Sequence, residues 1–447
     1  MPEPTTGAVR GTDGTDGTDG TDGTDSTNGV GHLSGTDRIG DPGDRESADA
    51  GVLMVVGIGA DGWAGLSPVA REAIEFAEVL MGSARQLGLV PDGRAEQVAW
   101  SSPLSESLPG LLATHQDRRI CVLASGDPTF HGIGTTLARL LGAGAVRVIP
   151  HPSSVSLACA RLGWPQDQVQ VISLVGRPLE LVQPQIQPGR RLVVLSWGAH
   201  TPAEVAAALT QRGYGASALT VLEQLGSPNE RVRTSRADQW DHEVDALNVI
   251  GVLCEADPAA PLLPTSPGLP DSAYESDGQL TKREVRAVTL SRLAPVPGQL
   301  LWDVGGGAGS IAIEWSRHHP SCRAVAIERD PDRAKRLERN AVNLGVSVRT
   351  VVGRAPQALA DLEAPDAVFV GGGATVAGMI DTCWAALRPG GRLVVNGVTL
   401  ETEALIAKWY AELGGDLVRL SVQRASPVGG LTGWRPAMPV TIWSVTK

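Results

Sequence analysis

The run LLWDVGGGAGSIAIEW, from Leu300 to Trp315, contains four glycines between two apolar segments. Its first five residues predict a buried strand and its last six a helix, so the glycines occupy the turn between them. Glycine lets the backbone approach a ligand closely, and a helix N-terminus offers N–H groups that have no partner within the helix. The turn therefore indicates a small-molecule site, although a tight connection without a ligand has the same outline.

The spacing of this turn separates two classes of ligand. Gly305 to Gly309 follow the pattern G-x-G-x-G, and Ser310 stands where a dinucleotide site has its third glycine. Asp303 precedes the turn, and its carboxylate would repel a diphosphate but suits the sulfonium and amine of S-adenosylmethionine (SAM). Glu328 ends the next predicted strand, where it can accept hydrogen bonds from ribose hydroxyls, as in NAD enzymes. The pattern favours SAM, with an NAD site and a ligand-free turn as alternatives.

Further segments continue this pattern. VVGRAP ends a predicted strand, with Ala355 able to offer its backbone to an adenine, and FVGGG ends the fourth strand. Thr281 is expected either to cap the first helix of this domain or to contact the ligand. Together with TKREVR and LRPGGRLVVNGVTLETE, these motifs resemble the decarboxylating precorrin methyltransferase domain of cobalamin biosynthesis over residues 269–447.

This resemblance implies a set of SAM contacts. The matching positions are Thr281, Gly305, Gly306, Gly307, Ala308, Gly309, Glu328 and Ala355. Arg354 departs from the family pattern, because many relatives carry an acid after the glycine of GRAP.

Four segments in the first half of the chain carry a different pattern: VVGIGADGWAGLSP, VLASGDPTFHGIG, VIPHPSSVSLACARLGW and LEQLGSPNERV. In this order they resemble the tetrapyrrole methylase family, in its precorrin carbon-5 methylating branch, over residues 51–255. That fold holds SAM in a cleft between two α/β lobes. The resemblance implies SAM-side positions at Gly126, Asp127, Gly134, Ser153 and Ser154.

The same resemblance places the substrate and marks one departure. The loop 57–62 is expected to border the tetrapyrrole, and His131 and His151 are candidates either for proton movement or for structural hydrogen bonds. Val175 stands in SLVGR, where relatives often have SLHGR. If that histidine orients the substrate, the activity of the first domain is the one affected.

Taken together, the two resemblances imply one bifunctional enzyme. It would use SAM to methylate carbons 5 and 15 of precorrin-6B and would remove carbon dioxide from the acetate on carbon 12, giving precorrin-8. Methyl transfer from a sulfonium depends on alignment rather than on a nucleophilic side chain, so no catalytic residue is assigned. The alternatives are the same chemistry on a cobalt-containing precorrin and a non-catalytic tetrapyrrole carrier.

A polyanionic tetrapyrrole needs cationic partners, and arginine pairs with carboxylates in a bidentate manner. The candidates are Arg177, Arg231, Arg233, Lys282, Arg283, Arg424 and Arg435.

Apolar strands alternate with helices over residues 51–255 and again over residues 280–447. This order predicts two α/β domains: a two-lobed tetrapyrrole methylase domain and a doubly wound, Rossmann-like SAM-dependent methyltransferase domain. Five prolines in residues 256–279 predict a linker between them. Near the start of the first domain, Ser67 is expected to cap a helix over residues 67–82.

The charge is unevenly distributed. Residues 1–50 hold eleven acids and three bases, so they account for −8 of the net charge of −11 and leave −3 for the rest. Their GTD repeat has no apolar surface, which predicts a disordered tail. The remaining chain is near neutral, and we expect no nucleic-acid partner.

Five scattered cysteines without CxxC spacing favour reduced thiols and a cytoplasmic protein. No His/Cys cluster suggests a metal, and neither a secretory signal nor a membrane span is expected. The tetrapyrrole methylase resemblance also implies a homo-oligomer.

Overall fold

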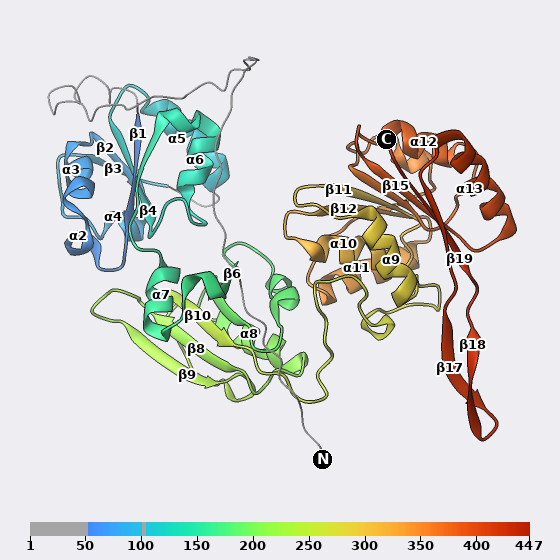
Figure 1. The fold of residues 1–447 in the computed structure, drawn as a ribbon. Coiled ribbons are helices and arrows are strands. Elements are labelled where there is room, and N and C mark those ends of the chain that lie inside the picture. Colours follow the sequence, from blue (N-terminus) through green and yellow to red (C-terminus); the bar gives the residue numbers. More distant parts are fainter. Residues whose placement is uncertain (1–51, 101–103) are drawn as a thin grey trace, which may run out of the picture. The chain divides into compact units, whose positions relative to one another are not determined.

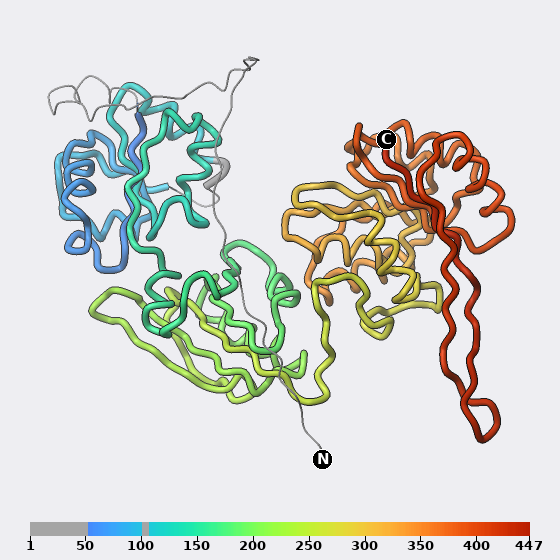
Figure 2. The backbone as a smooth tube through the Cα atoms, in the orientation of Figure 1, coloured from blue at the N-terminus to red at the C-terminus, as the bar shows by residue number. Residues whose placement is uncertain are grey.

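The computed structural model describes residues 52–100 and 104–447. Figure 1 gives the ribbon and Figure 2 the backbone path. The predicted acidic tail, residues 1–50, lies outside the described residues. Both predicted α/β domains are present, and the predicted fold class is confirmed.

The first lobe of the first domain is a parallel five-stranded sheet in the order β3-β2-β4-β1-β5. Its strands are β1 Leu53–Ile58, β2 Val79–Gly82, β3 Glu96–Ala99, β4 Ile120–Ser125 and β5 Val146–Ile149. Its helices are α2 Gly62–Gly65, α3 Pro68–Phe76, α4 Ala84–Leu87, α5 Leu104–Thr114 and α6 Ile133–Leu141. Val55 and Met81 pack into the core on one face, whereas Val56 and Leu80 pack into the core on the other. Apolar residues thus cover both faces, as a buried parallel sheet requires.

The predicted helix over residues 67–82 is shorter than expected. Ser67 does cap it, since its Oγ accepts a hydrogen bond from the N–H of Ala70 at 3.2 Å. The helix ends at Phe76, however, and Val79–Gly82 form β2 beside β4. All four residues of β2 are buried, so the run VLMG serves both faces of a sheet rather than one face of a helix.

The second lobe is a mixed sheet in the order β6-β7-β10-β8-β9. Its strands are β6 Val169–Ser173, β7 Arg191–Leu195, β8 Ala218–Glu223, β9 Arg231–Arg236 and β10 Asn248–Leu253. Its helices are α7 Ser154–Leu162 and α8 Thr201–Gln211. β6 and β7 are parallel, and the other pairs are antiparallel.

The second domain is a seven-stranded sheet in the order β13-β12-β11-β14-β15-β19-β16. Its strands are β11 Leu300–Val304, β12 Arg323–Glu328, β13 Arg349–Val352, β14 Ala367–Val370, β15 Arg392–Gly397, β16 Asp416–Leu420 and β19 Val440–Thr446. Its helices are α9 Arg283–Leu293, α10 Ser310–His318, α11 Pro331–Asn343, α12 Met379–Ala386 and α13 Leu400–Leu413. Only β19 runs against its neighbours within this sheet. The strand order reverses beside β11, which is where open α/β sheets bind their ligands.

Successive residues of β11 serve the two cores of this sheet. Trp302 and Val304 pack into the core formed with α12 and α13. Leu301 packs into the core formed with α9 and α10. Because side chains alternate along a strand, Asp303 lies on the same face as Leu301, beneath α10.

A hairpin leaves the sheet between β16 and β19. It consists of β17 Gln423–Val428 and β18 Leu431–Pro436, and it extends as a two-stranded ribbon (Figures 1 and 2). β16 runs in the same direction as β15, so the hairpin starts from the edge at which β11 to β14 end. Leu431 and Trp434 on it are 79% and 73% exposed.

The proline-rich segment 256–279 contains a single 3₁₀ turn over Asp271–Ala273. It is not a free linker throughout. Leu263, Leu269 and Tyr274 are buried and pack with Ile313 of α10 among the neighbouring apolar residues. The prolines exclude long helices and strands, but the apolar residues between them still provide enough surface for the segment from Leu263 onward to join the core.

Candidate active site

Four parallel strand ends meet at one edge of the second domain. β11 lies between β12 and β14, and β13 follows β12, all in parallel register. The glycine turn, Glu328, the GRAP segment and Gly371 to Gly373 therefore gather at one edge, although they are far apart in sequence. This is the position at which a doubly wound sheet holds a nucleotide-like ligand.

The glycine turn is built from left-handed backbone. Gly305, Gly307 and Gly309 have φ values of 79°, 55° and 81°, which favour glycine. A Cβ on Gly305 would lie 3.0 Å from the backbone N of Gly372, so the two glycine segments approach each other closely. The turn thus forms a backbone cradle without side chains at these three positions.

Glu328 fixes this cradle. The residue is 5% exposed at the end of β12. Its Oε2 accepts a hydrogen bond from the N–H of Gly307 at 2.9 Å, and its Oε1 accepts one from Asp330 at 3.0 Å. Each carboxylate oxygen has a second lone pair, so the ribose contact predicted for Glu328 is compatible with this support.

The Asp303 carboxylate was expected to face the ligand, but it points into the protein. It is 1% exposed, and its Oδ2 accepts a hydrogen bond from the N–H of Ala312 in α10 at 3.1 Å. Burial raises the pKa of this carboxyl to about 7, and the nearby charge of Glu328 acts in the same direction. Because side chains alternate between the two faces along β11, Asp303 points into the junction between β11 and α10.

Thr281 does not cap α9. The cap position is Lys282, one residue later, and it makes no side-chain cap bond. The Thr281 hydroxyl has no hydrogen bond within the part of the chain that the structure describes. The other predicted role of Thr281, contact with a ligand, stays a prediction. Ala355 is half-buried against the core, and Arg354 beside it is exposed.

In the first domain, three loops converge beyond neighbouring strands β1, β4 and β5. Gly126 donates its N–H to the carbonyl of Ile58 at 3.0 Å and accepts the N–H of His151 at 3.4 Å. A Cβ on Gly57 would lie 2.0 Å from the carbonyl oxygen of Gly126. The His151 ring lies 3.2 Å from Asp61, measured from Nε2 to Oδ1. The loop after β1 is thus brought against the GDP segment.

The remaining predicted SAM positions of the first domain lie in these loops. Asp127 uses its Oδ1 locally, accepting hydrogen bonds from the N–H and hydroxyl of Thr129 at 2.8 and 2.7 Å. A Cβ on Gly134 would lie 2.8 Å from the carbonyl oxygen of Pro128. Ser153 caps α7, and Ser154 is the first residue of that helix. Asp127 and Ser153 therefore shape the loops as well as bordering the predicted site.

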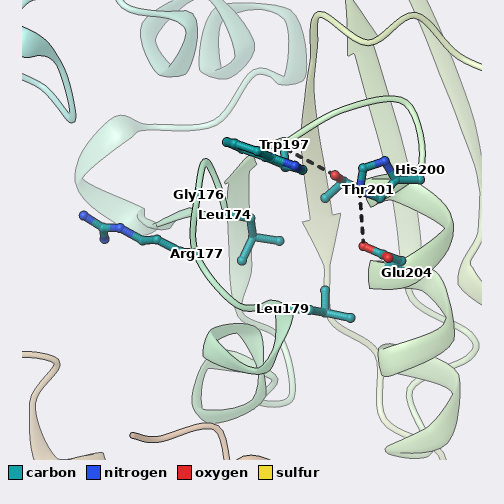
Figure 3. A pocket seen from close by; sticks show the side chains of 8 residues that line it. All are labelled: Leu174, Gly176, Arg177, Leu179, Trp197, His200, Thr201 and Glu204. Carbon is teal, nitrogen blue, oxygen red and sulfur yellow. Dashed lines mark hydrogen bonds and ion pairs between the residues drawn. The ribbon is translucent and has the colours of Figure 1, made fainter. Parts of the chain in front are cut away.

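The second lobe contains a cavity of about 320 Å³ (Figure 3). Its lining residues are Leu174, Gly176, Arg177, Leu179, Trp197, His200, Thr201 and Glu204. Trp197, beyond the end of β7, is 59% exposed. Val175 is 52% exposed within the SLVGR segment that forms one wall, and the imidazole among the lining residues is that of His200.

The predicted substrate arginines fall into two groups. Arg231 and Arg233 both pair with the fully buried Glu223, at 2.9 and 3.1 Å. Their charge is partly neutralised, which weakens the case for a substrate role. Arg177 is exposed at the cavity. Lys282, Arg283 and Arg435 are exposed in the second domain, and Arg424 pairs with Glu284 of α9.

A buried ion pair in the second domain was not predicted from the sequence. Arg286 of α9 is fully buried, and its Nε lies 2.5 Å from Oε1 of Glu314 in α10. The spacing of Arg286 with Leu290 and Leu293 places it on the buried stripe of α9, and this spacing is the signal that was available.

Two kinds of feature are absent from residues 52–100 and 104–447. No group of three or more His, Cys, Asp or Glu side chains is arranged to hold a metal ion there. Within the same residues, no helix combines the length and the apolar character needed to cross a membrane.

Comparison with known proteins bears on both halves of the chain. Residues 52–241 match the family of tetrapyrrole (corrin/porphyrin) methylases, and residues 272–447 match the precorrin methyltransferase domain. The solved C-terminal domain of precorrin-6Y C5,15-methyltransferase from Rhodobacter capsulatus is 44% identical, with a TM-score of 0.40, and covers 41% of this chain and 100% of its own.

Two curated relatives extend over both halves. The precorrin-6Y C(5,15)-methyltransferase [decarboxylating] of Mycobacterium tuberculosis (strain CDC 1551 / Oshkosh) is 46% identical over 89% of this chain and 100% of its own length. The protein of the same name from Sinorhizobium sp is 48% identical over 88% of this chain and 96% of its own length. At this identity and coverage, the chain belongs to the family of decarboxylating precorrin-6Y C(5,15)-methyltransferases.

Proposed function

We propose that the chain transfers two methyl groups to precorrin-6B, one to carbon 5 and one to carbon 15, and removes the acetate carboxyl on carbon 12 as carbon dioxide. The products are precorrin-8 and two molecules of S-adenosylhomocysteine. The main supporting observation is the glycine turn of the second domain, whose left-handed glycines are joined to Glu328 by a hydrogen bond. Family membership supports the same reaction.

Methyltransferase families of this kind use SAM, which supplies a methyl group on a positively charged sulfur. We assign one SAM site to each domain. In the second domain, Gly305 to Gly309 offer their backbone to the ligand. Side chains at Gly305 and Gly309 would clash with Gly372 and Leu337 of the protein, so the turn keeps its shape only with glycine there. Glu328 holds the turn through Gly307 and accepts hydrogen bonds from the ribose hydroxyls.

Thr281 and Ala355 complete the second-domain site, with the Thr281 hydroxyl and the Ala355 backbone as ligand contacts. Asp303 acts from beneath the turn, where its ionised form favours a cationic ligand above it, and such a ligand would in turn lower its raised pKa. Gly306, Gly307 and Ala308 contribute backbone to the same turn, and Ala308 accepts a hydrogen bond from Asn340 at 2.9 Å.

In the first domain, the SAM side is formed by the converging loops. Gly126 and Gly134 occupy positions where a Cβ would meet backbone, as a close approach requires. Ser153 and Ser154 open α7, whose N-terminal N–H groups favour polar or anionic ligand atoms. The Asp61–His151 pair lies beside the loop 57–62, where a proton released on carbon methylation can be accepted.

The substrate carries several carboxylates, and exposed cations lie at the edge where the cradle opens. Lys282 and Arg283 stand at the start of α9, and Arg435 lies on the hairpin that leaves the same edge. In the first domain, Arg177 lies at the cavity. These residues are the proposed carboxylate partners, ahead of Arg231 and Arg233.

A mass spectrum tests the proposal. The purified chain is incubated with precorrin-6B and SAM that carries a heavy methyl group. Two labelled methyl groups gained with one carbon dioxide lost are the expected result. One methyl gained with decarboxylation would restrict activity to the second domain and implicate Val175 in the loss of the first. An unchanged substrate would overturn the proposal and direct attention to a cobalt-containing precorrin or to a carrier role.

We also propose a cytoplasmic homo-oligomer. All five cysteines are unpaired and buried, which suits a reducing compartment. The exposed Leu431 and Trp434 on the β17–β18 hairpin are an apolar surface that self-association would cover. Light scattering of the purified chain at several concentrations tests the oligomer, and a mass equal to one chain throughout would contradict it.

A further inference from the structure

The segment 268–281 of the second domain leads from the proline-rich region to α9 and ends beside the glycine turn. Apart from the 3₁₀ turn over Asp271–Ala273 it has no regular secondary structure. A Cβ on Gly307 would lie 3.8 Å from the carbonyl oxygen of Gln279. Thr281, a proposed SAM contact, follows two residues later. Whatever holds this segment in place therefore determines one wall of the second SAM site.

The carboxylate of Glu314 holds the beginning of the segment. The residue is 3% exposed on α10. Its Oε2 accepts the N–H of Gly268 at 2.6 Å, and its Oε1 accepts the N–H of Leu269 at 3.1 Å. The Tyr274 hydroxyl donates to the same Oε1 at 2.8 Å. Three groups of the segment thus converge on one buried side chain.

The guanidinium of Arg286 connects this carboxylate to the end of the segment. Its Nε donates to Oε1 of Glu314 at 2.5 Å, and its Nη1 donates to the carbonyl oxygen of Thr281 at 2.5 Å. Nη1 also donates to Asp271 at 3.2 Å, and Nη2 donates to the carbonyl oxygen of Leu269. Only arginine provides this planar set of donors, because a lysine ammonium is a single compact point of charge.

A third attachment joins the segment directly to the glycine turn. The Asn340 side chain of α11 accepts the N–H of Glu275 at 2.9 Å and donates to the carbonyl oxygens of Glu275 and Ala308, both at 2.9 Å. The segment and the turn are therefore fastened to the same amide, so that displacement of one affects the other.

We propose that Arg286 and Glu314 are positioning residues for the methyl transfer in the second domain. They hold the segment 268–281 so that Thr281 and Gln279 border the SAM site. This inference rests on the proposed function, specifically on a SAM site at the glycine turn. A buried ion pair is in general no more stabilising than well-packed apolar side chains. Here its hydrogen bonds are directed at the backbone of a segment that borders the site.

The test uses the full chain, whose first domain serves as an internal control. Arg286→Lys is compared with Arg323→Lys, which alters an exposed ion pair with Glu363 in the same domain. Carbon dioxide release reports the second domain, and methylation at carbon 5 reports the first. We expect Arg286→Lys to raise the KM for SAM in carbon dioxide release by about tenfold or more, as loss of a hydrogen bond to a charged group would. In Arg286→Lys, the KM for SAM in carbon-5 methylation should not change. In Arg323→Lys, the KM for SAM should not change in either reaction.

A double-mutant cycle separates positioning from general damage. If Arg286 acts through Thr281, Thr281→Ala raises the KM for SAM in the wild-type background and adds little in the Arg286→Lys background. Should Arg286→Lys not fold, the Arg286→Met, Glu314→Leu double variant replaces the ion pair with apolar side chains. A folded variant of either kind with an unchanged KM for SAM overturns the inference. If the wild-type chain releases no carbon dioxide in a SAM-dependent manner, the proposed function itself fails.

Discussion

Asp303 provides a prediction whose sign follows from its burial. The carboxyl is 1% exposed and its pKa is raised from 3.8 to about 7, chiefly by burial. Between these two values the folded state binds more protons than the unfolded state, so stability falls as pH rises from about 4 to about 7. At ~1.4 kcal/mol per pH unit, the full difference is about 4 kcal/mol as an upper bound. Asp303→Asn keeps the size and an acceptor for the N–H of Ala312 but does not titrate.

The measurement is urea unfolding of the wild-type chain and Asp303→Asn at pH 5 and pH 8 without SAM. Relative to the wild type, the free energy of unfolding of the second domain in Asp303→Asn should rise by roughly 2.5 kcal/mol from pH 5 to pH 8. Glu363→Gln is the control. Arg323 lowers the pKa of Glu363 to about 2, so the stabilisation by Glu363 is fully present above pH 5 and its removal should be independent of pH in this range. Parallel pH profiles for the wild-type chain and Asp303→Asn would refute the argument.

The remaining predictions concern one residue each. Gly309→Ala should destabilise the second domain by about 2 kcal/mol or more, because Gly309 has a φ of 81° and an added Cβ would lie 2.5 Å from Leu337 Cγ. Urea unfolding measures this loss, and a value below about 0.5 kcal/mol would contradict the prediction. Ser153→Ala should lower the stability of the first domain by about 1 kcal/mol through loss of the α7 cap, and an unchanged unfolding midpoint for that domain would argue against the cap. Glu223→Gln should cost about 2 kcal/mol at pH 7, because two arginines of β9 lose their buried carboxylate; equal stability in thermal unfolding would count against that pairing.

Local patterns in the sequence predicted the fold class and the left-handed glycine turn of the second domain. The alternation of apolar strands with helices predicted both α/β domains, because burial on two faces leaves continuous apolar runs. The left-handed turn and the place of Glu328 at the end of a strand were predicted from spacing alone, since both depend on residues close together in the chain. The cap at Ser67 was found for the same reason. The helix predicted over residues 67–82 failed because an apolar run of four residues has no period of its own.

Other features were decided only by the tertiary structure, because they depend on groups that are far apart in the chain. Arg286 and Glu314 are separated by 28 positions, yet together they hold the segment 268–281, which its prolines had marked as a linker. Asp303 faces the N–H of Ala312, since the core beneath α10 sets its direction. Glu223 of β8 forms ion pairs with Arg231 and Arg233 of β9, because the two strands are paired. Spacing along a chain reports which face a residue occupies, whereas the partner that it meets there is set by how the elements pack.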